Sequence, residues 1–190
     1  PVTSPAGSPM TSPTAKISLA TAWLDGCSGC HMSFLDMDER LVDLVARVDI
    51  VYSPLVDTKH LPERVDIGIL EGSISNEEDL AKAQEFRRHC DLLISLGDCA
   101  VNGNVPAMRN GIKLDAVYDR AYLETVTTNP VRPAIRVPAL LDKVRPIHET
   151  VDVDIFVPGC PPPADAIWYV LSELLEGRRP DPTRVTRFGA

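Results

Sequence analysis

The chain has 190 residues, enough for one domain with a hydrophobic core, and 44% of them are apolar. Its formal net charge of −8 argues against binding of nucleic acid, which requires a basic face. No apolar run approaches the roughly 18 residues of a membrane span, and no basic segment followed by an apolar one opens the chain as a secretory signal would. We therefore expect a cytoplasmic protein that binds neither nucleic acid nor membrane.

The predicted elements alternate between strands and helices after an N-terminal arm. Residues 1–15 are rich in Pro, Ser and Thr and too poor in apolar residues to fold alone, so we expect a disordered or partner-bound arm. Short apolar stretches then predict strands at 16–24, 49–54, 65–72, 91–98 and 151–159. Amphipathic stretches predict helices at 33–48, 76–89, 114–126 and 163–176. This order indicates an α/β fold with a mostly parallel sheet and helices on both faces.

Two of these helices carry recognisable end signals. Ser75 and Glu78 match a capping box at the start of 76–89, and basic residues occupy the last turn of that helix, where the helix dipole is negative. Gly177 is the expected stop of the helix at 163–176. We therefore place the folded domain at 16–177.

Two segments are expected to contact partners rather than the core. Residues 126–150 contain four prolines and show no regular pattern, and a loop of that length in a compact domain is usually functional or partner-bound. We predict an irregular partner-contact segment there. The basic tail at 178–190 is expected to lie along the surface or a partner.

Four of the five cysteines come just after a predicted strand: Cys27 and Cys30 after the first, Cys99 after the fourth and Cys160 after the fifth. Because the carboxyl ends of parallel strands share one edge, we expect these thiols to converge. Four thiolates suit a tetrahedral zinc ion or an iron–sulfur cluster. Only one pair has a short spacing, and a proline follows Cys160 as at the last ligand of ferredoxin-type clusters, so the pattern favours 4Fe–4S.

Two alternatives of other functional classes remain. Cys27 and Cys30 form a C-x-x-C pair beside a strand–helix unit, which is also typical of a thiol-disulfide oxidoreductase. That interpretation leaves Cys99 and Cys160 unexplained. The other alternative is a zinc-stabilised interaction domain. Cys90 precedes the fourth strand, at the opposite end from the other cysteines, and is expected to be a buried thiol.

Three further residues near the cysteines invite a functional interpretation. Glu71 ends the third strand on the same edge, where a partly desolvated carboxylate can exchange protons near neutral pH, although it can equally serve the turn or dipole of the next helix. His31 can donate a hydrogen bond to cluster sulfur, but we expect a surface or partner contact. Asn104, with its neighbours Asn102 and Gly103, shapes the loop after Cys99 and can supply N–H donors to sulfide.

Four stretches together resemble the small subunit of nickel–iron hydrogenases, in particular the one-cluster small subunit of soluble NAD-reducing hydrogenases. The resemblance covers residues 16–177 in order, and four motifs in order are more specific than any one of them. The stretches are DGCSGCHMSFLD, ILEGSISNEED, LISLGDCAVNGNVPAMRN and VPGCPPPADAIWYVL.

The resemblance implies a flavodoxin-like fold and a single proximal 4Fe–4S cluster held by Cys27, Cys30, Cys99 and Cys160. It implies a separate large subunit whose nickel–iron site splits H2, and diaphorase-type subunits with FMN and further iron–sulfur clusters that pass electrons to NAD+ (H2 + NAD+ = H+ + NADH). It also implies a role for Glu71 in carrying protons from the large subunit's site.

Departures from related families narrow the expectation. Ser28 and Gly29 separate the first two cysteines, whereas these are adjacent in the related subunit of respiratory complex I. The chain shows neither the twin-arginine leader nor the additional cluster domain of many membrane-bound or periplasmic small subunits, so the one-cluster, cytoplasmic type is expected. Related hydrogenases that use NADP, F420 or a thiol-type acceptor stay open, because other chains bind the acceptor.

Overall fold

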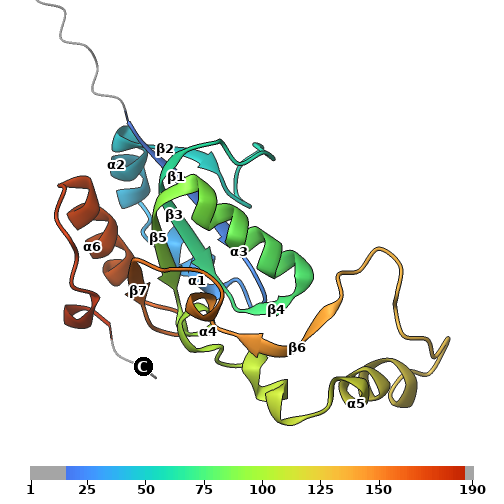
Figure 1. The fold of residues 1–190 in the computed structure, drawn as a ribbon. Coiled ribbons are helices and arrows are strands. Elements are labelled where there is room, and N and C mark those ends of the chain that lie inside the picture. Colours follow the sequence, from blue (N-terminus) through green and yellow to red (C-terminus); the bar gives the residue numbers. More distant parts are fainter. Residues whose placement is uncertain (1–15, 187–190) are drawn as a thin grey trace, which may run out of the picture.

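The computed structural model describes residues 16–186 (Figure 1). The expected arm at 1–15 and the end of the tail at 187–190 lie outside the described residues. The central feature is a five-stranded sheet in which every pairing is parallel. Its strands are β1 (Ile17–Trp23), β2 (Val48–Tyr52), β3 (Val65–Glu71), β5 (Cys90–Leu96) and β7 (Ile155–Val157). All five predicted strands are therefore confirmed, within a few residues at their ends.

The order of the strands creates a topological switch point between β1 and β3. The sheet runs β2-β1-β3-β5-β7, so the chain builds outward from β1 in one direction and from β3 in the other. In such sheets ligands bind beyond the carboxyl ends of the strands, and the order is that of the flavodoxin-like fold. The predicted fold class is confirmed.

Helices cover both faces of the sheet, because almost continuously apolar parallel strands need cover on both sides (Figure 1). One hydrophobic core joins the sheet to α1 (Gly29–Leu35), α2 (Arg40–Arg47) and α6 (Ala164–Leu175). A second core joins the opposite face to α3 (Glu77–His89) and α4 (Asp98–Asn102). Gly177 adopts a left-handed φ of +70° after α6, which confirms it as the stop of that helix.

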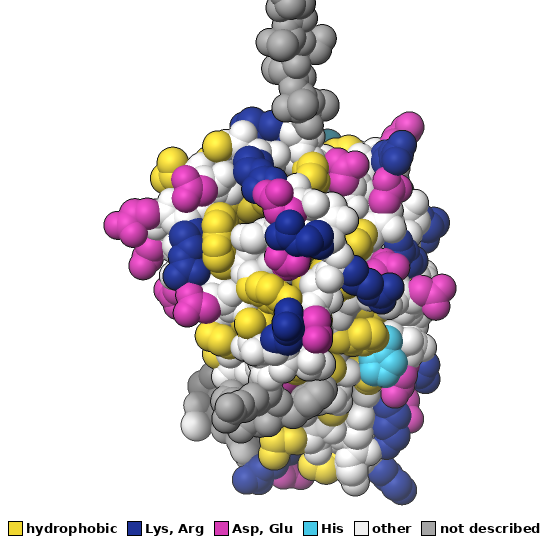
Figure 2. All heavy atoms as spheres, turned by 90° about the vertical axis from the view of Figure 1, so that its left-hand side faces the viewer, with side chains coloured by type: hydrophobic (Ala, Val, Ile, Leu, Met, Phe, Trp, Pro, Cys, Tyr) yellow, Lys and Arg dark blue, Asp and Glu magenta, His cyan; other side chains and the backbone are white. Residues whose placement is uncertain are grey.

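The outer surface of α2 and α6 mixes charges of both signs, as Figure 2 shows. Arg40 pairs with Asp165 at 2.6 Å and Arg47 pairs with Glu176 at 2.9 Å, so the two helices are also linked to each other by ion pairs. Exposed pairs of this kind contribute little stability. None of the described helices is long and apolar enough to cross a membrane.

The predicted helix at 33–48 is in fact two helices, α1 and α2. The chain turns at Asp38, which has a left-handed φ of +51° that Asp tolerates better than most residues. The apolar periodicity continues across this turn because Phe34, Met37 and Leu44 all enter the same core. The pattern therefore predicted the buried face correctly but not the break.

The predicted capping box of the next helix is displaced by one residue. Asn76 is the N-cap of α3: its side-chain oxygen accepts hydrogen bonds from the N–H groups of Glu78 and Asp79, both at 2.9 Å. Asp79 completes the box by accepting from the backbone of Asn76. The assignment to Ser75 and Glu78 is wrong: Ser75 lies one residue further back in strand β4 (Ile74–Asn76), and its hydroxyl donates to the Asp79 carboxylate instead of accepting from the helix N–H groups.

The prediction of irregular structure throughout 126–150 is wrong at 140–145. There β6 (Leu140–Arg145) pairs antiparallel with β4 in a two-stranded sheet, and a 3-10 turn follows at Ile147–Glu149. Burial of Val144 and Ile147 stabilises this second sheet, but a strand this short with several charged residues gives little sequence signal.

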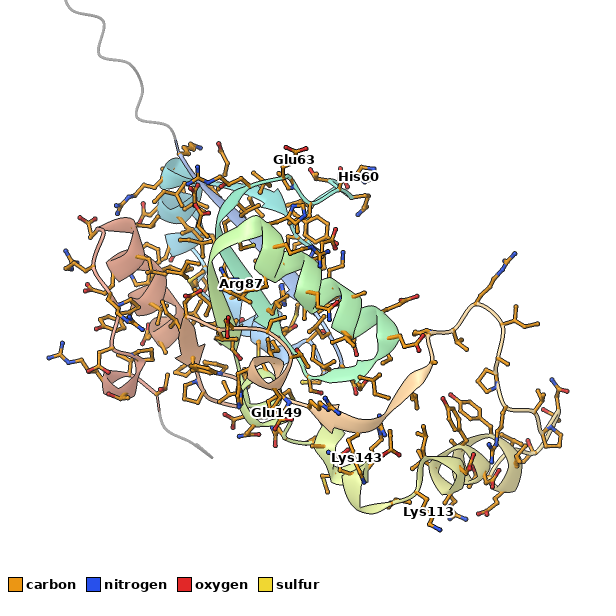
Figure 3. The ribbon with its side chains drawn as sticks, in the orientation of Figure 1. His60, Glu63, Arg87, Lys113, Lys143 and Glu149 are labelled. Carbon is orange, nitrogen blue, oxygen red and sulfur yellow. The ribbon has the colours of Figure 1, made fainter. Side chains whose placement is uncertain are left out.

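A projecting arm leaves the domain between α4 and β6 (Figure 1). It contains a 3-10 helix (Pro106–Gly111), α5 (Leu114–Asp119) and the π-helical turn η2 (Arg120–Glu124), which confirms the helix predicted near 114–126. Figure 3 shows Lys113 at the start of α5 and Lys143 on β6, both near the place where the arm leaves the domain. The side chain of Arg132 bonds Asp115 at 2.8 Å within the arm, while Arg109 donates to the carbonyl oxygen of Leu141 at 2.8 Å and ties the base of the arm to β6.

Candidate metal centre

The four predicted cysteines converge on one pocket at the carboxyl edge of the sheet, here called the cysteine pocket. Cys27 lies in the loop after β1 and Cys30 in the first turn of α1, while Cys99 lies in α4 after β5 and Cys160 follows β7. The remaining lining residues are Gly26, Ser28, Gly29, Glu71, Gly72, Asp98, Gly159 and Pro161. Three loops that are far apart in sequence thus bring their thiols to one place.

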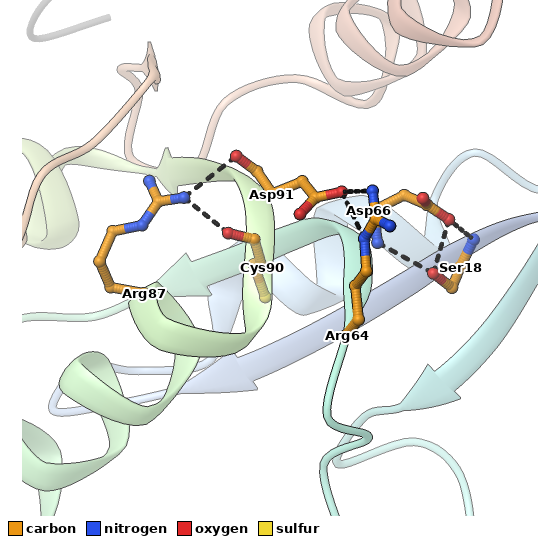
Figure 4. Close-up of polar contacts among 6 residues, drawn as sticks. All are labelled: Ser18, Arg64, Asp66, Arg87, Cys90 and Asp91. Atoms are coloured by element: carbon orange, nitrogen blue, oxygen red, sulfur yellow. Dashed lines mark hydrogen bonds and ion pairs between the residues drawn. The ribbon is translucent and has the colours of Figure 1, made fainter.

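The fifth cysteine lies at the opposite end of the sheet, as predicted. Cys90 is the first residue of β5, is 4% exposed and pairs in register with Val65 at the start of β3. Figure 4 shows the polar contacts at this amino edge, where Arg87 donates to the carbonyl oxygen of Cys90 at 2.6 Å. Burial raises the pKa of the Cys90 thiol to about 11, which suits an inert structural thiol.

Glycine is required where the backbone passes closest to the thiols. Gly97 has φ of +86°, a conformation that side chains rarely adopt, and a Cβ atom there would overlap Cys30 Sγ. A Cβ atom on Gly29 would lie 3.2 Å from Cys27 Sγ. The glycines beside the cysteines therefore leave space around the sulfur atoms.

A buried carboxylate joins the Cys99 loop to the Cys160 loop. Asp98 is 6% exposed, and its side chain accepts a hydrogen bond from the N–H of Gly159 at 2.7 Å. The N–H of Asp98 donates in return to the carbonyl oxygen of Gly159 at 2.8 Å. No local pattern in the sequence indicates this contact, because the two residues are 61 positions apart.

The pocket disfavours free thiolates. Burial raises the pKa of the Cys30 thiol, and the carboxylate of Glu71 raises it further through its charge and a hydrogen bond. Burial also raises the pKa of Cys99, with smaller contributions from Cys160 and Cys27. Bound iron would supply the positive charge that stabilises thiolates here.

Glu71 and His31 form a buried pair behind the cysteine pocket. Both are 2% exposed, and His31 Nδ1 lies 2.7 Å from Glu71 Oε1. The other ring nitrogen of His31 lies 2.9 Å from the hydroxyl of Thr21, which donates to Ser53 at 2.8 Å. These contacts connect the pocket to the carboxyl end of β2 through a line of hydrogen-bonding side chains.

The expectation for His31 and one of the two alternatives for Glu71 are wrong. His31 is not a surface residue, and its partners on β1 and β3 explain why the sequence did not reveal this, since they lie 10 and 40 positions away. Glu71 does not serve the start of α3, because Asn76 and Asp79 fill that role. The side chain of Glu71 instead faces Cys30 and His31.

The geometry suits a centre larger than a single ion. Among residues 16–186, no group of three or more His, Cys, Asp or Glu side chains is arranged to hold one metal ion. A 4Fe–4S cluster takes four cysteine ligands that surround it, one at each iron, instead of meeting at one point. Four thiols that line a shared pocket therefore fit a cluster.

Comparison with known proteins identifies the family. Residues 27–174 match the family model described as NADH ubiquinone oxidoreductase, 20 Kd subunit, and the chain belongs to this family. Within it, the chain is 46% identical over 179 residues to the NAD-reducing hydrogenase HoxS subunit delta of Cupriavidus necator, an alignment that covers 91% of this chain and 86% of that subunit. The resemblance to hydrogenase small subunits is thereby confirmed.

Other relatives also belong to hydrogenases. A chain of the F420-non-reducing hydrogenase of Methanothermobacter marburgensis is 43% identical over 168 residues, but the alignment covers only 54% of that longer chain. A crystal structure of NAD+-reducing [NiFe]-hydrogenase contains a chain with 40% identity and a TM-score of 0.87, which covers 92% of this chain and 99% of that one. The [NiFeSe] hydrogenase of Desulfovibrio vulgaris Hildenborough, at 16% identity and a TM-score of 0.53, shares the fold.

Proposed function

We propose that this chain is the electron-transfer small subunit of a cytoplasmic NAD-reducing nickel–iron hydrogenase. In this proposal Cys27, Cys30, Cys99 and Cys160 hold one 4Fe–4S cluster. The observation that carries the proposal is the convergence of these four thiols, from three distant loops, on one pocket. It is supported by the 46% identity to the delta subunit of an NAD-reducing hydrogenase.

The chemistry of the pocket supports the proposal over the thiol-disulfide alternative. A dithiol enzyme would need only Cys27 and Cys30, yet Cys99 and Cys160 line the same pocket. When bound, the cluster would supply one-electron chemistry. The pocket would hold it at the carboxyl edge of the sheet, close to the protein surface, where a partner subunit can approach.

A single cluster has no substrate of its own, so the proposal requires neighbours on both sides. We place a large subunit with the nickel–iron site on one side, where H2 is split. On the other side we place diaphorase-type subunits with FMN and further iron–sulfur clusters, which reduce NAD+. Cys160 and Cys27 are exposed at the mouth of the pocket, which suits electron transfer across an interface.

The projecting arm is the segment that we propose to cover the large subunit. Met108 is 76% exposed and Ile135 is 85% exposed, and Val105, Ile112 and Val131 are also more than half exposed. Apolar side chains gathered on one projecting segment indicate an interaction surface. Because 140–145 is paired in the small sheet, we move this proposed partner contact from 126–150 to the arm at 104–139.

Glu71 is proposed to pass protons from the large subunit's site. Its carboxylate lies beside the cysteine pocket and is hydrogen-bonded to His31, which in turn contacts Thr21. A line of groups that both donate and accept protons is what a transfer route requires. This role is independent of the cluster ligands and is tested separately below.

A related hydrogenase with a different electron acceptor is the second candidate. The identity to the relative from the F420-non-reducing hydrogenase, 43%, is close to the 46% for the NAD-reducing one. The alignment covers 86% of the subunit from the NAD-reducing hydrogenase but only 54% of the chain from the F420-non-reducing one, which favours the NAD-reducing type. The acceptor is bound by other chains, so only the intact complex can decide.

The deciding experiment is analysis of iron, zinc and acid-labile sulfide in the complex, purified anaerobically through a tag on this chain. About four irons and four sulfides per chain, beyond those of identified partner subunits, are expected for one 4Fe–4S cluster. One zinc per chain would instead support the interaction domain, and no metal would support the oxidoreductase. Reduction of NAD+ by H2 in the same preparation identifies the acceptor.

A further inference from the structure

The loop after α4 holds an asparagine in an unusual backbone conformation. Asn104 has φ of +33°, in the left-handed region that few residues other than glycine adopt. Its backbone N–H donates to the side-chain oxygen of Asn102 at 2.9 Å. Its carbonyl oxygen accepts from the N–H of Ala107 at 3.2 Å. The backbone is thus fixed on both sides of the residue.

This conformation directs the Asn104 amide at the thiols of the cysteine pocket. Its Nδ2 atom donates to Cys160 Sγ at 3.4 Å, a normal length for a hydrogen bond to sulfur. The amide of one loop therefore donates to the sulfur atom of another loop, 56 positions away in the sequence.

Acidic side chains also act on the cysteines of the pocket: Glu71 faces Cys30, and the charge of Asp25 acts on Cys99. Negative groups disfavour the additional electron of a reduced cluster, whereas an N–H donor to a ligand sulfur favours it. Among residues 16–186, the hydrogen bond to Cys160 comes from Asn104.

We infer that Asn104 sets the reduction potential of the cluster, by donating an amide N–H bond to the ligand sulfur of Cys160. This inference rests on the proposed function, because it requires the cluster. Strained backbone is retained where the surrounding structure fixes it for a purpose, and here the purpose is the direction of the amide. Asn104 is a positioning and tuning residue that leaves the ligation itself to the cysteines.

Two substitutions remove the donor in different ways. Asn104→Gly deletes the amide and adopts the left-handed backbone without strain. Asn104→Asp keeps the size of the side chain but replaces the N–H donor with a carboxylate oxygen. Asn102→Asp is the matched control, since it adds the same charge to the same loop and retains the oxygen that supports the backbone of Asn104.

The measurement is a redox titration of the anaerobically purified complex, followed by the electron paramagnetic resonance of its clusters, with iron content determined alongside. Both Asn104 variants are expected to keep the wild-type iron content and to shift the midpoint potential of this cluster to a more negative value. Asn104→Asp is expected to shift it further than Asn104→Gly, and Asn102→Asp less than Asn104→Asp.

Three results would overturn the inference. The first is a wild-type potential in Asn104→Gly with full iron content. The second is an equal shift in Asn102→Asp and Asn104→Asp, which would assign the effect to charge. The third is loss of iron in both Asn104 variants, which would make the residue necessary for assembly instead. A wild-type complex without this cluster would refute the proposed function itself, which is a distinguishable outcome.

Discussion

Asp98 and Gly159 exchange two hydrogen bonds at the edge of the cysteine pocket, with lengths of 2.7 and 2.8 Å. The adjacent residues are Cys99 and Cys160, so each loop that carries a single cysteine is tied to the other. A neighbouring bond, from the N–H of Gly97 to the carbonyl oxygen of Val157 at 2.8 Å, extends the connection along the strands. The spacing of these two cysteines therefore depends on two backbone hydrogen bonds and on the buried carboxylate of Asp98.

Asp98→Ala is expected to reduce the amount of cluster that the chain retains. It leaves the N–H of Gly159 buried without its acceptor, which costs about 1–3 kcal/mol and frees the Cys160 loop. Iron and sulfide per chain, together with the thermal unfolding temperature, measure both effects. Asp98→Asn keeps an acceptor oxygen and serves as the control. Full iron content in Asp98→Ala would contradict a role for the Asp98–Gly159 hydrogen bond in holding the cluster.

Gly97→Ala is expected to disrupt the pocket more strongly. The new Cβ atom would overlap Cys30 Sγ, and the φ of +86° is itself unfavourable for alanine. The side chain of Cys30 must then move out of the pocket that it lines together with the other three thiols. Gly111→Ala is the control, because no atom lies within 4 Å of a Cβ atom there. We expect loss of iron in the first variant and a wild-type content in the second.

The sequence predicted those features for which a physical rule relates a local residue pattern to a place in the fold. The strands could be predicted because buried parallel strands are almost continuously apolar. The meeting of Cys27 with Cys99 and Cys160 could be predicted because parallel strands end at one edge. Neither step required knowledge of any side-chain contact.

The remaining features depend on contacts between distant residues. His31 is buried by Thr21 and Glu71, and nothing beside it in the sequence indicates those partners. Strand β6 forms because β4 offers an edge, and its own residues carry a weak strand signal. The N-cap shifted from Ser75 to Asn76 because pairing with β6 extended the strand by that one residue.

Limited proteolysis tests the projecting arm as a partner surface. Trypsin is expected to cut the isolated chain after residues of the arm such as Lys113 and Arg136, and to cut much more slowly in the complex, where a partner covers the arm. Lys59, which is exposed in the loop between β2 and β3, lies outside both the arm and the tail and provides the internal control. Equal rates of cleavage in the arm with and without partners would count against this interface.

Glu71→Gln tests proton transfer without altering a cluster ligand. Glutamine retains the size of the side chain and can still hydrogen-bond His31, but it cannot release a proton, so H2 turnover is expected to fall by a factor on the order of 10². Iron content and the electron paramagnetic resonance signal of the reduced cluster should be unchanged. This result would separate a loss of proton transfer from a failure to assemble the cluster. Glu85→Gln, at a carboxylate paired with Lys82 on α3, is the control for the loss of one charge. Unchanged turnover in Glu71→Gln would leave the carboxylate with a structural role as the buried partner of His31.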